Sequence, residues 1–141
     1  MSEQEIQRKY MQLQLLKQQL TALLEEKQVI DEKVSELLTT SNALNELGKI
    51  KEKEEIWSPL GSGAFVRSDI KDKEKVLVSI GSDIAIKETR TNAIEILQER
   101  LKEIIEVDKE LSSEIEKFNT QITKLEPEIQ QLIQKEQKSQ K

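Results

Sequence analysis

Apolar residues recur at alternating steps of three and four along two long stretches, one before residue 48 and one after residue 89. This alternation is typical of the seam of a two-helix coiled coil, and it is narrower than the apolar stripe of a helix in a globular core. It predicts one helix over residues 1–48 and another over 89–134, followed by a polar tail over 135–141 that we expect to fray. The first seam comprises Ile6, Tyr10, Leu13, Leu16, Leu20, Leu23, Lys27, Ile30, Val34, Leu37, Ser41 and Leu44, and the second comprises Ile94, Leu97, Leu101, Ile104, Asp108, Leu111, Ile115, Phe118, Ile122, Leu125, Ile129 and Leu132.

The ends of the two helices carry recognisable signals. Gly48 follows the last apolar residues of the first stretch and is expected to cap that helix at its C-terminus. Thr89 or Thr91 is expected to cap the start of the second helix. Pro127 lies inside the second seam and removes a backbone donor, so we expect a kink or a weakening there.

Each seam has a charged exception, Lys27 in the first and Asp108 in the second. If the chain folds back as an antiparallel pair of helices, these two residues fall in adjacent layers of the coil. We hypothesise that their side chains interact and help to fix the register. The alternative is that Lys27 snorkels to solvent and Asp108 is solvated at a loose place in the coil.

Between the helices, residues 49–88 have the pattern of two β-hairpins. Strands are expected over 55–58 and 64–67 around a Pro-Leu-Gly-Ser-Gly turn, and over 76–80 and 84–86 around a Gly-Ser-Asp turn. Two such hairpins are marginal in water and leave edges and an apolar face open, so we expect them to associate with other subunits. The residues expected to mediate this oligomerisation are Ile56, Trp57, Phe65, Val66, Val76, Val78, Ile80, Ile84 and Ile86.

Composition excludes several classes of function. The chain has no cysteine and no histidine, which removes disulfides, thiolate chemistry and the commonest general base and metal ligand. We therefore expect no enzyme activity, no catalytic residues, no metal and no cofactor. A net charge of −5 argues against nucleic-acid binding. There is no signal peptide and no apolar run of membrane length, so a cytoplasmic protein with no membrane partner is expected.

The free ends of the two helices carry apolar residues both on and off the seams. A two-helix coil would not bury the off-seam residues Met11 and Ile133 fully. One interpretation is ordinary seam residues with stray surface apolar side chains. The other is an end loosened by Pro127 that offers apolar surface to unfolded polypeptides. The candidate client-binding residues, called the tip residues below, are Ile6, Tyr10, Met11, Leu13, Leu125, Ile129, Leu132 and Ile133.

The order helix, two hairpins, helix, with SPLGSGAFV at 58–66 and KVLVSIGS at 75–82, resembles the alpha class of archaeal prefoldin subunits over nearly the whole chain. The resemblance implies one α+β domain over 1–141, in which a long antiparallel two-helix coiled coil is joined by two hairpins that complete a β-barrel by oligomerisation. It implies a heterohexamer of two alpha and four beta subunits with six coiled-coil tentacles. It also implies ATP-independent capture of non-native proteins at the tentacle ends and transfer to a group II chaperonin. The family carries no catalytic motif to transfer to this chain.

Two other functions remain open from the sequence. One is a structural coiled-coil adaptor whose helices dock a single folded partner. The other is an alpha-like paralogue of the same family that assembles into filaments.

Overall fold

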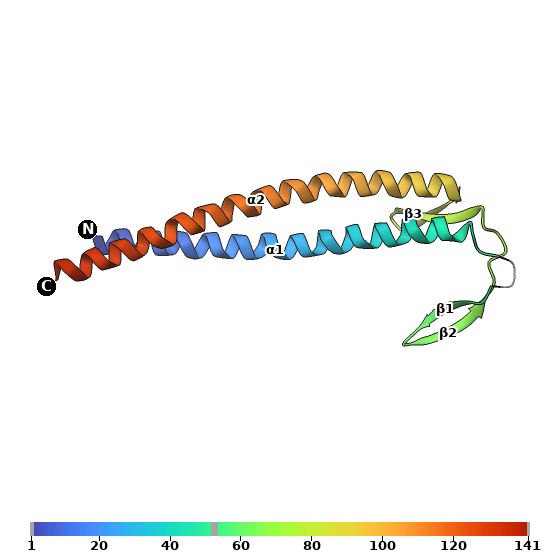
Figure 1. Ribbon diagram of the computed structural model, residues 1–141, viewed down its shortest axis with the longest axis horizontal. Coiled ribbons are helices and arrows are strands. Elements are labelled where there is room, and N and C mark those ends of the chain that lie inside the picture. Colours follow the sequence, from blue (N-terminus) through green and yellow to red (C-terminus); the bar gives the residue numbers. More distant parts are fainter. Residues whose placement is uncertain (1, 52–53, 141) are drawn as a thin grey trace. The chain divides into compact units, whose positions relative to one another are not determined.

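The computed structural model describes residues 2–51 and 54–140, and its element order is helix, two hairpins, helix (Figure 1). The helices are α1 (Ser2–Leu47) and α2 (Arg90–Ser139). The strands are β1 (Ile56–Gly61), β2 (Ala64–Ser68), β3 (Lys75–Gly81) and β4 (Ile84–Thr89). The α+β class, with two long helices joined by two antiparallel hairpins, is therefore confirmed.

The helix ends differ in part from the sequence expectation. The hydroxyl of Thr89 accepts a hydrogen bond from the backbone N–H of Asn92 at 3.1 Å, so Thr89 is the N-terminal cap of α2. The α2 helix passes through Pro127 and continues to Ser139, beyond the boundary expected at residue 134. No glycine or further proline follows Pro127, and the Gln, Lys and Glu residues of this segment favour helix. The polar tail is thus mostly helical.

Contacts divide the chain into two compact units. The helical unit consists of α1 up to Lys33 together with α2 from Ile104 onward. The hairpin unit, Val34–Glu103, contains both hairpins, the end of α1 and the start of α2. Each unit has its own buried apolar residues, and each is described separately.

In the helical unit, the start of α1 lies antiparallel to the end of α2. Leu13, Leu125 and Ile129 form a buried cluster, with Leu16 and Ile122 packed against it. Two ion pairs join the helices beside this cluster, Lys9 to Glu128 at 3.1 Å and Lys17 to Glu126 at 3.0 Å. These pairs are substantially exposed, so the buried cluster contributes most of the association of the two helices here.

The charged exceptions of the two seams meet as hypothesised. Lys27 Nζ lies 2.8 Å from Asp108 Oδ1 across the coil and 3.0 Å from Asp31 Oδ1 on its own helix. Less than a third of the Lys27 and Asp108 side chains is exposed. The hydrogen bond to Asp108, followed by that to Asp31, holds the pKa of Lys27 above its ordinary value of 10.5. A slipped register would separate Lys27 from Asp108 and bury one charge without a partner, so the pair favours the observed register.

From the pair of Lys27 and Asp108 we predict that the folded chain loses stability at alkaline pH. The pKa of Lys27 is higher in the folded than in the unfolded chain, so the contribution of the pair is complete below about pH 10.5. It disappears as the pH rises through the folded pKa. We expect urea unfolding to show a constant difference between the wild type and Lys27→Gln from neutral pH to about pH 10, and a shrinking difference above it. A difference that persists unchanged in more alkaline buffer would contradict the role of this pair.

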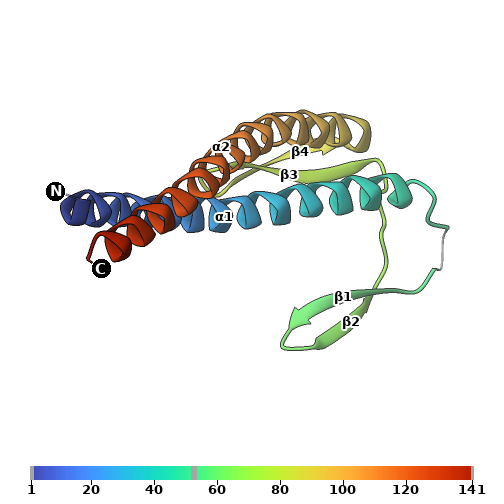
Figure 2. The same ribbon diagram turned by 60° about the vertical axis from the view of Figure 1, so that its left-hand side comes forward.

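In the hairpin unit, the two hairpins form separate two-stranded antiparallel sheets. Both turn through two central residues with positive φ, Ser62–Gly63 in the first hairpin and Ser82–Asp83 in the second, which matches the twist of the flanking strands. The β3–β4 hairpin lies beside the start of α2 (Figure 2). Arg100 Nη2 donates a hydrogen bond to the carbonyl of Ser79 at 2.6 Å, and the backbone N–H of Arg90 donates one to the carbonyl of Glu74 at 2.7 Å.

Gly48 leaves room for the side chain of Arg90, at the start of α2, to reach the end of α1. The helix ends at Leu47, one residue before the expected boundary, and the expectation of a glycine cap is wrong because the backbone of Gly48 does not adopt the left-handed conformation. Instead, a Cβ at Gly48 would lie 2.7–2.8 Å from the guanidinium of Arg90. That guanidinium donates to the carbonyl of Leu44 at 3.5 Å. It supplies positive charge at the end of a helix whose last turn has no basic residue.

We therefore expect Gly48→Ala to displace the Arg90 guanidinium, which is the far end of a flexible side chain, and to destabilise the chain by no more than about 1 kcal/mol, the usual value of a lost hydrogen bond. In an Arg90→Ala background the same substitution is expected to cost much less, because the clash no longer exists. A double-mutant cycle by thermal unfolding measures this coupling. Equal costs in the two backgrounds would show that Gly48 acts through its backbone rather than through Arg90.

Candidate functional site

The hairpins carry large apolar side chains that are exposed to solvent in the single chain. We call this set the hairpin surface, and it comprises Trp57, Leu60, Phe65, Val66, Leu77, Ile80 and Ile84. Exposed aromatic and aliphatic side chains that lie close together are typical of surfaces that bind other proteins. Trp57 and Phe65 lie on the same face of the first hairpin, because their cross-strand partners are Arg67 and Pro59.

The residues predicted for oligomerisation divide by burial. Trp57, Phe65, Val66, Ile80 and Ile84 are exposed, whereas Ile56, Val76 and Ile86 are half-buried. Val78 is 8% exposed and is therefore part of the packing of the chain itself. It lies next to Ser79, whose carbonyl accepts a hydrogen bond from Arg100 of α2, so this part of β3 is in contact with α2. In this conformation Val78 is not accessible to another subunit.

Two residues of the hairpin surface were missed by the sequence interpretation. Leu60 and Leu77 are its most exposed members, at 71% and 72%. Leu60 was read as part of a turn, but it is the extra residue at the register shift between Pro59 and Gly61. Leu77 lies between Val76 and Val78 and therefore points to the opposite face. The run Val76-Leu77-Val78 places apolar side chains on both faces of β3, and Leu77 could have been predicted from this run.

The tip residues also divide by burial. Leu13, Leu125 and Ile129 are buried in the cluster of the helical unit, and Ile6 and Leu132 are half-buried. Tyr10, Met11 and Ile133 are exposed. Leu15, which was not predicted, is 55% exposed and lies one helical turn from Met11. These two side chains line an open groove on α1 together with Gln12, Gln14 and Gln18.

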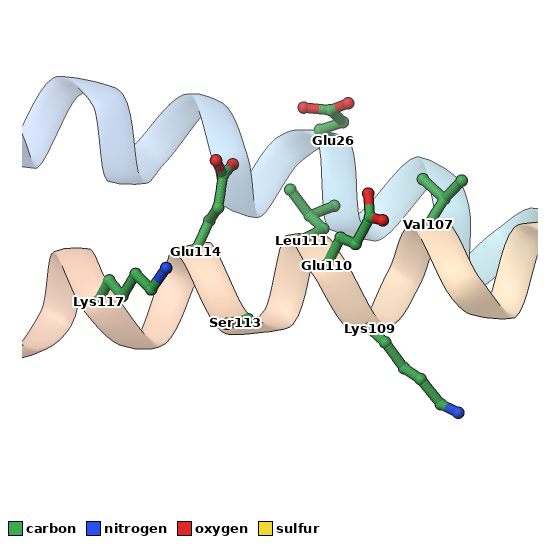
Figure 3. Close-up of a pocket in the computed structure, with 8 residues that line it drawn as sticks. All are labelled: Glu26, Val107, Lys109, Glu110, Leu111, Ser113, Glu114 and Lys117. Atoms are coloured by element: carbon green, nitrogen blue, oxygen red, sulfur yellow. The ribbon is translucent and has the colours of Figure 1, made fainter.

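A second groove of about 600 Å³ lies in the helical unit, lined by Glu26 of α1 and by residues of α2 between Val107 and Lys117 (Figure 3). Its lining is of mixed charge. The carboxylates of Glu26, Glu110 and Glu114 lie around the apolar side chain of Leu111, and the basic residues are Lys109 and Lys117. Among residues 2–51 and 54–140 there is no group of three or more acidic, histidine or cysteine side chains that could hold a metal ion. Nothing in this groove assembles a nucleophile with a base that activates it.

The same described residues contain no helical segment that is long and apolar enough to cross a membrane.

Comparisons with known proteins agree with this architecture. The family described as prefoldin subunit matches residues 16–135. The alpha subunit of prefoldin from Pyrococcus horikoshii is 32% identical, with 90% of this chain and 88% of the relative covered. The corresponding alpha subunit from Archaeoglobus fulgidus is 30% identical, with 96% and 98% covered.

Solved structures show the same fold at lower identity. The cryo-EM structure of filamentous PFD from Methanocaldococcus jannaschii has a TM-score of 0.69 at 23% identity, covering 82% of this chain and 95% of that one. The crystal structure of the prefoldin beta subunit from Thermococcus strain KS-1 has a TM-score of 0.59 at 19% identity, covering 90% of each chain. The family match spans most of the chain and the alpha-subunit relatives cover nearly all of it, so the chain belongs to the prefoldin family.

Proposed function

We propose that this chain is the alpha-type subunit of an ATP-independent holdase, which captures non-native proteins and passes them to a group II chaperonin in the cytoplasm. The observation that carries the proposal is that apolar side chains are exposed both on the hairpins and near the ends of the helices, with others, such as Leu24 and Val29, elsewhere on α1. A holdase subunit needs one surface for assembly and another for clients. No catalytic role, cofactor or metal belongs to this proposal.

For assembly, the proposed partners are beta subunits, in a complex of two alpha and four beta chains. The exposed hairpin surface supports this assignment, because two-stranded hairpins with apolar faces gain stability when another subunit covers them. The alpha-subunit relatives support the choice of class. Completion of a β-barrel by the hairpins of several subunits is part of the same proposal.

For client binding, the exposed residues Tyr10, Met11, Leu15 and Ile133 are the best candidates. Methionine adapts its shape to irregular apolar partners, which suits clients without a fixed structure. The buried residues Leu13, Leu125 and Ile129 would contribute only if the two helices separated. Each contact is weak by itself, so several subunits acting on one client would supply avidity.

The test is suppression of aggregation of a denatured protein by this chain mixed with a candidate beta subunit. Replacing Met11 and Leu15 together by glutamine is expected to reduce the suppression several-fold, because their apolar surface is lost. Val29→Gln is the matched control, since Val29 is similarly exposed on the same helix and lies away from the tip residues. Removal of about ten residues from each terminus should abolish suppression. Full activity after this trimming would contradict client binding at the helix ends.

The filament-forming alternative has one specific observation in its favour, namely the fold likeness to filamentous PFD. Native mass measurement separates the two functions. A holdase subunit forms a defined complex when the beta subunit is added, whereas a filament former gives very large species without it. A structural adaptor would assemble but would not suppress aggregation.

A further inference from the structure

Glutamine is concentrated at the free ends of the two helices. Eleven of the fourteen glutamines of the chain lie in residues 1–20 and 130–140, and residues 29–97 contain none. These two segments share one end of the helical unit, because the start of α1 lies antiparallel to the end of α2 (Figure 1). Glu and Lys supply most of the polar side chains of α2 between residues 99 and 117, whereas amides outnumber charged side chains at the ends.

On α1 these amides alternate with apolar side chains along one face of the helix. We call this set the amide stripe, and it comprises Gln7, Met11, Gln14, Leu15 and Gln18. Its members follow one another at steps of three or four residues, so they share one side of the helix, and all five are exposed. Four of them line the open groove on α1. In the part of the chain that the structure describes, the amides of the three glutamines make no hydrogen bond to another residue.

A side-chain amide is chemically matched to the backbone of a non-native protein. It has N–H donors and a carbonyl acceptor, as a peptide group has. A segment without secondary structure carries unpaired peptide groups at nearly every residue, whatever its sequence. A purely apolar surface would remove water from these groups without replacing its hydrogen bonds, which is unfavourable. A carboxylate only accepts and an ammonium group only donates, so neither matches both halves of the peptide group.

We propose that the amide stripe binds the main chain of an extended client segment. Met11 and Leu15 contact the apolar side chains of the segment, and the three glutamines form hydrogen bonds with its peptide groups. This inference rests on the proposed function, because it specifies which groups of a client are recognised. The stripe spans about 17 Å of helix at about 1.5 Å per residue. This length matches about five residues of extended polypeptide at about 3.3 Å each.

The same chemistry favours an extended segment over a helical one. The peptide groups of a helix are paired within the helix itself, so a helical partner would leave the amides of the stripe with little to bind. A partner rich in charge would be matched better by charged side chains than by neutral amides. Recognition through the main chain also requires no particular client sequence beyond some apolar side chains for Met11 and Leu15.

Replacement of Gln7, Gln14 and Gln18 by methionine tests the amides separately from the apolar surface. Methionine has a similar length and helix propensity, but its thioether is at most a weak acceptor. The probe is an uncharged, unstructured peptide of alternating leucine, serine and glycine, added to the complex of this chain with a beta subunit. We expect the triple variant to bind it at least about fivefold more weakly, the effect of one ordinary hydrogen bond, although its apolar surface is larger.

The matched control replaces Gln28, Gln98 and Gln121 by methionine. These are the three glutamines outside the end segments, and all three are exposed. The control should bind the peptide as tightly as the wild type does, because the same chemical change is made away from the stripe.

A second peptide tests the other partner of the proposed hydrogen bonds. It has the same side chains but is N-methylated at alternate peptide nitrogens, so it lacks part of its N–H donors. The wild-type complex should bind it at least about fivefold more weakly than the parent peptide. The triple variant of the stripe should bind the two peptides equally, because the amides that sense the missing donors are gone.

The outcomes separate this inference from the proposed function. Equal or tighter binding of the parent peptide by the triple variant, or an equal loss in the control, would overturn main-chain recognition. The same holds if the wild type suppresses aggregation of a denatured protein but does not bind the peptide, or if the triple variant still discriminates between the two peptides. In each of these cases suppression by the wild type would leave the proposed function intact. A wild-type complex that neither binds the peptide nor suppresses aggregation would remove both.

Discussion

Replacing Leu125 by alanine is expected to lower the free energy of unfolding by about 2–5 kcal/mol, the usual range for a buried leucine whose cavity is not refilled. Leu125 is 8% exposed and belongs to the cluster with Leu13 and Ile129. Ile30 and Leu111 are also buried in the helical unit, but Leu13, Leu125 and Ile129 are the ones that pack together as a cluster. We therefore expect a large fall in the midpoint of thermal unfolding followed by circular dichroism.

Met11→Ala is the matched control for this prediction. Met11 is 70% exposed on the same unit, and its truncation should change the free energy of unfolding by no more than about 0.5 kcal/mol. The two variants also separate stability from client binding, because Met11→Ala should weaken aggregation suppression without altering the melt. Similar stability losses in both variants would show that the cluster does not hold the helix ends together.

The second large effect is expected on assembly. Trp57→Ala should weaken association with partner subunits by about 30- to 1,000-fold, which corresponds to the 2–4 kcal/mol typical of a central interface tryptophan. Trp57 is 55% exposed in the chain alone, so its removal leaves no buried cavity and should preserve the helix content. Native mass at decreasing protein concentration measures the shift from complex to monomer.

Leu24→Ala is the control for the assembly experiment. Leu24 is exposed to a similar extent but lies in the helical unit, away from the hairpin surface. It should leave the dissociation constant nearly unchanged. A Trp57→Ala variant that assembles as tightly as the wild type would contradict the assignment of the hairpins as the assembly surface.

Much of the fold could be predicted because its signals are local in the sequence. The alternation of three and four predicts the helical seam, and it also placed Lys27 and Asp108 near enough to meet at 2.8 Å. The turns at Gly61–Gly63 and Gly81–Asp83 are visible because positive φ favours glycine, asparagine and aspartate. The end of α2 was misplaced because a polar composition lowers neither helix propensity nor hydrogen bonding within the helix.

The division of each candidate surface into exposed and buried residues could not be read from the sequence. Whether Val78 or Leu77 faces the interior depends on which side of β3 docks on α2, and Arg100, 21 residues away from Ser79, takes part in that docking. Likewise, Leu13 and Ile129 have the same apolar character as Met11 and Ile133. Only the packing of the helices decides which of them is accessible.

Pro59 and Arg100 leave the first strands of the two hairpins open to different kinds of change. In β1, Pro59 has no N–H to offer, and no movement of a side chain can alter this. In β3, the carbonyl of Ser79 accepts a hydrogen bond from one flexible side chain, so a rotation of Arg100 or its substitution would free that carbonyl. A single surface position can therefore change the hydrogen bonding of the second hairpin, whereas a change in the first requires replacement of the proline itself.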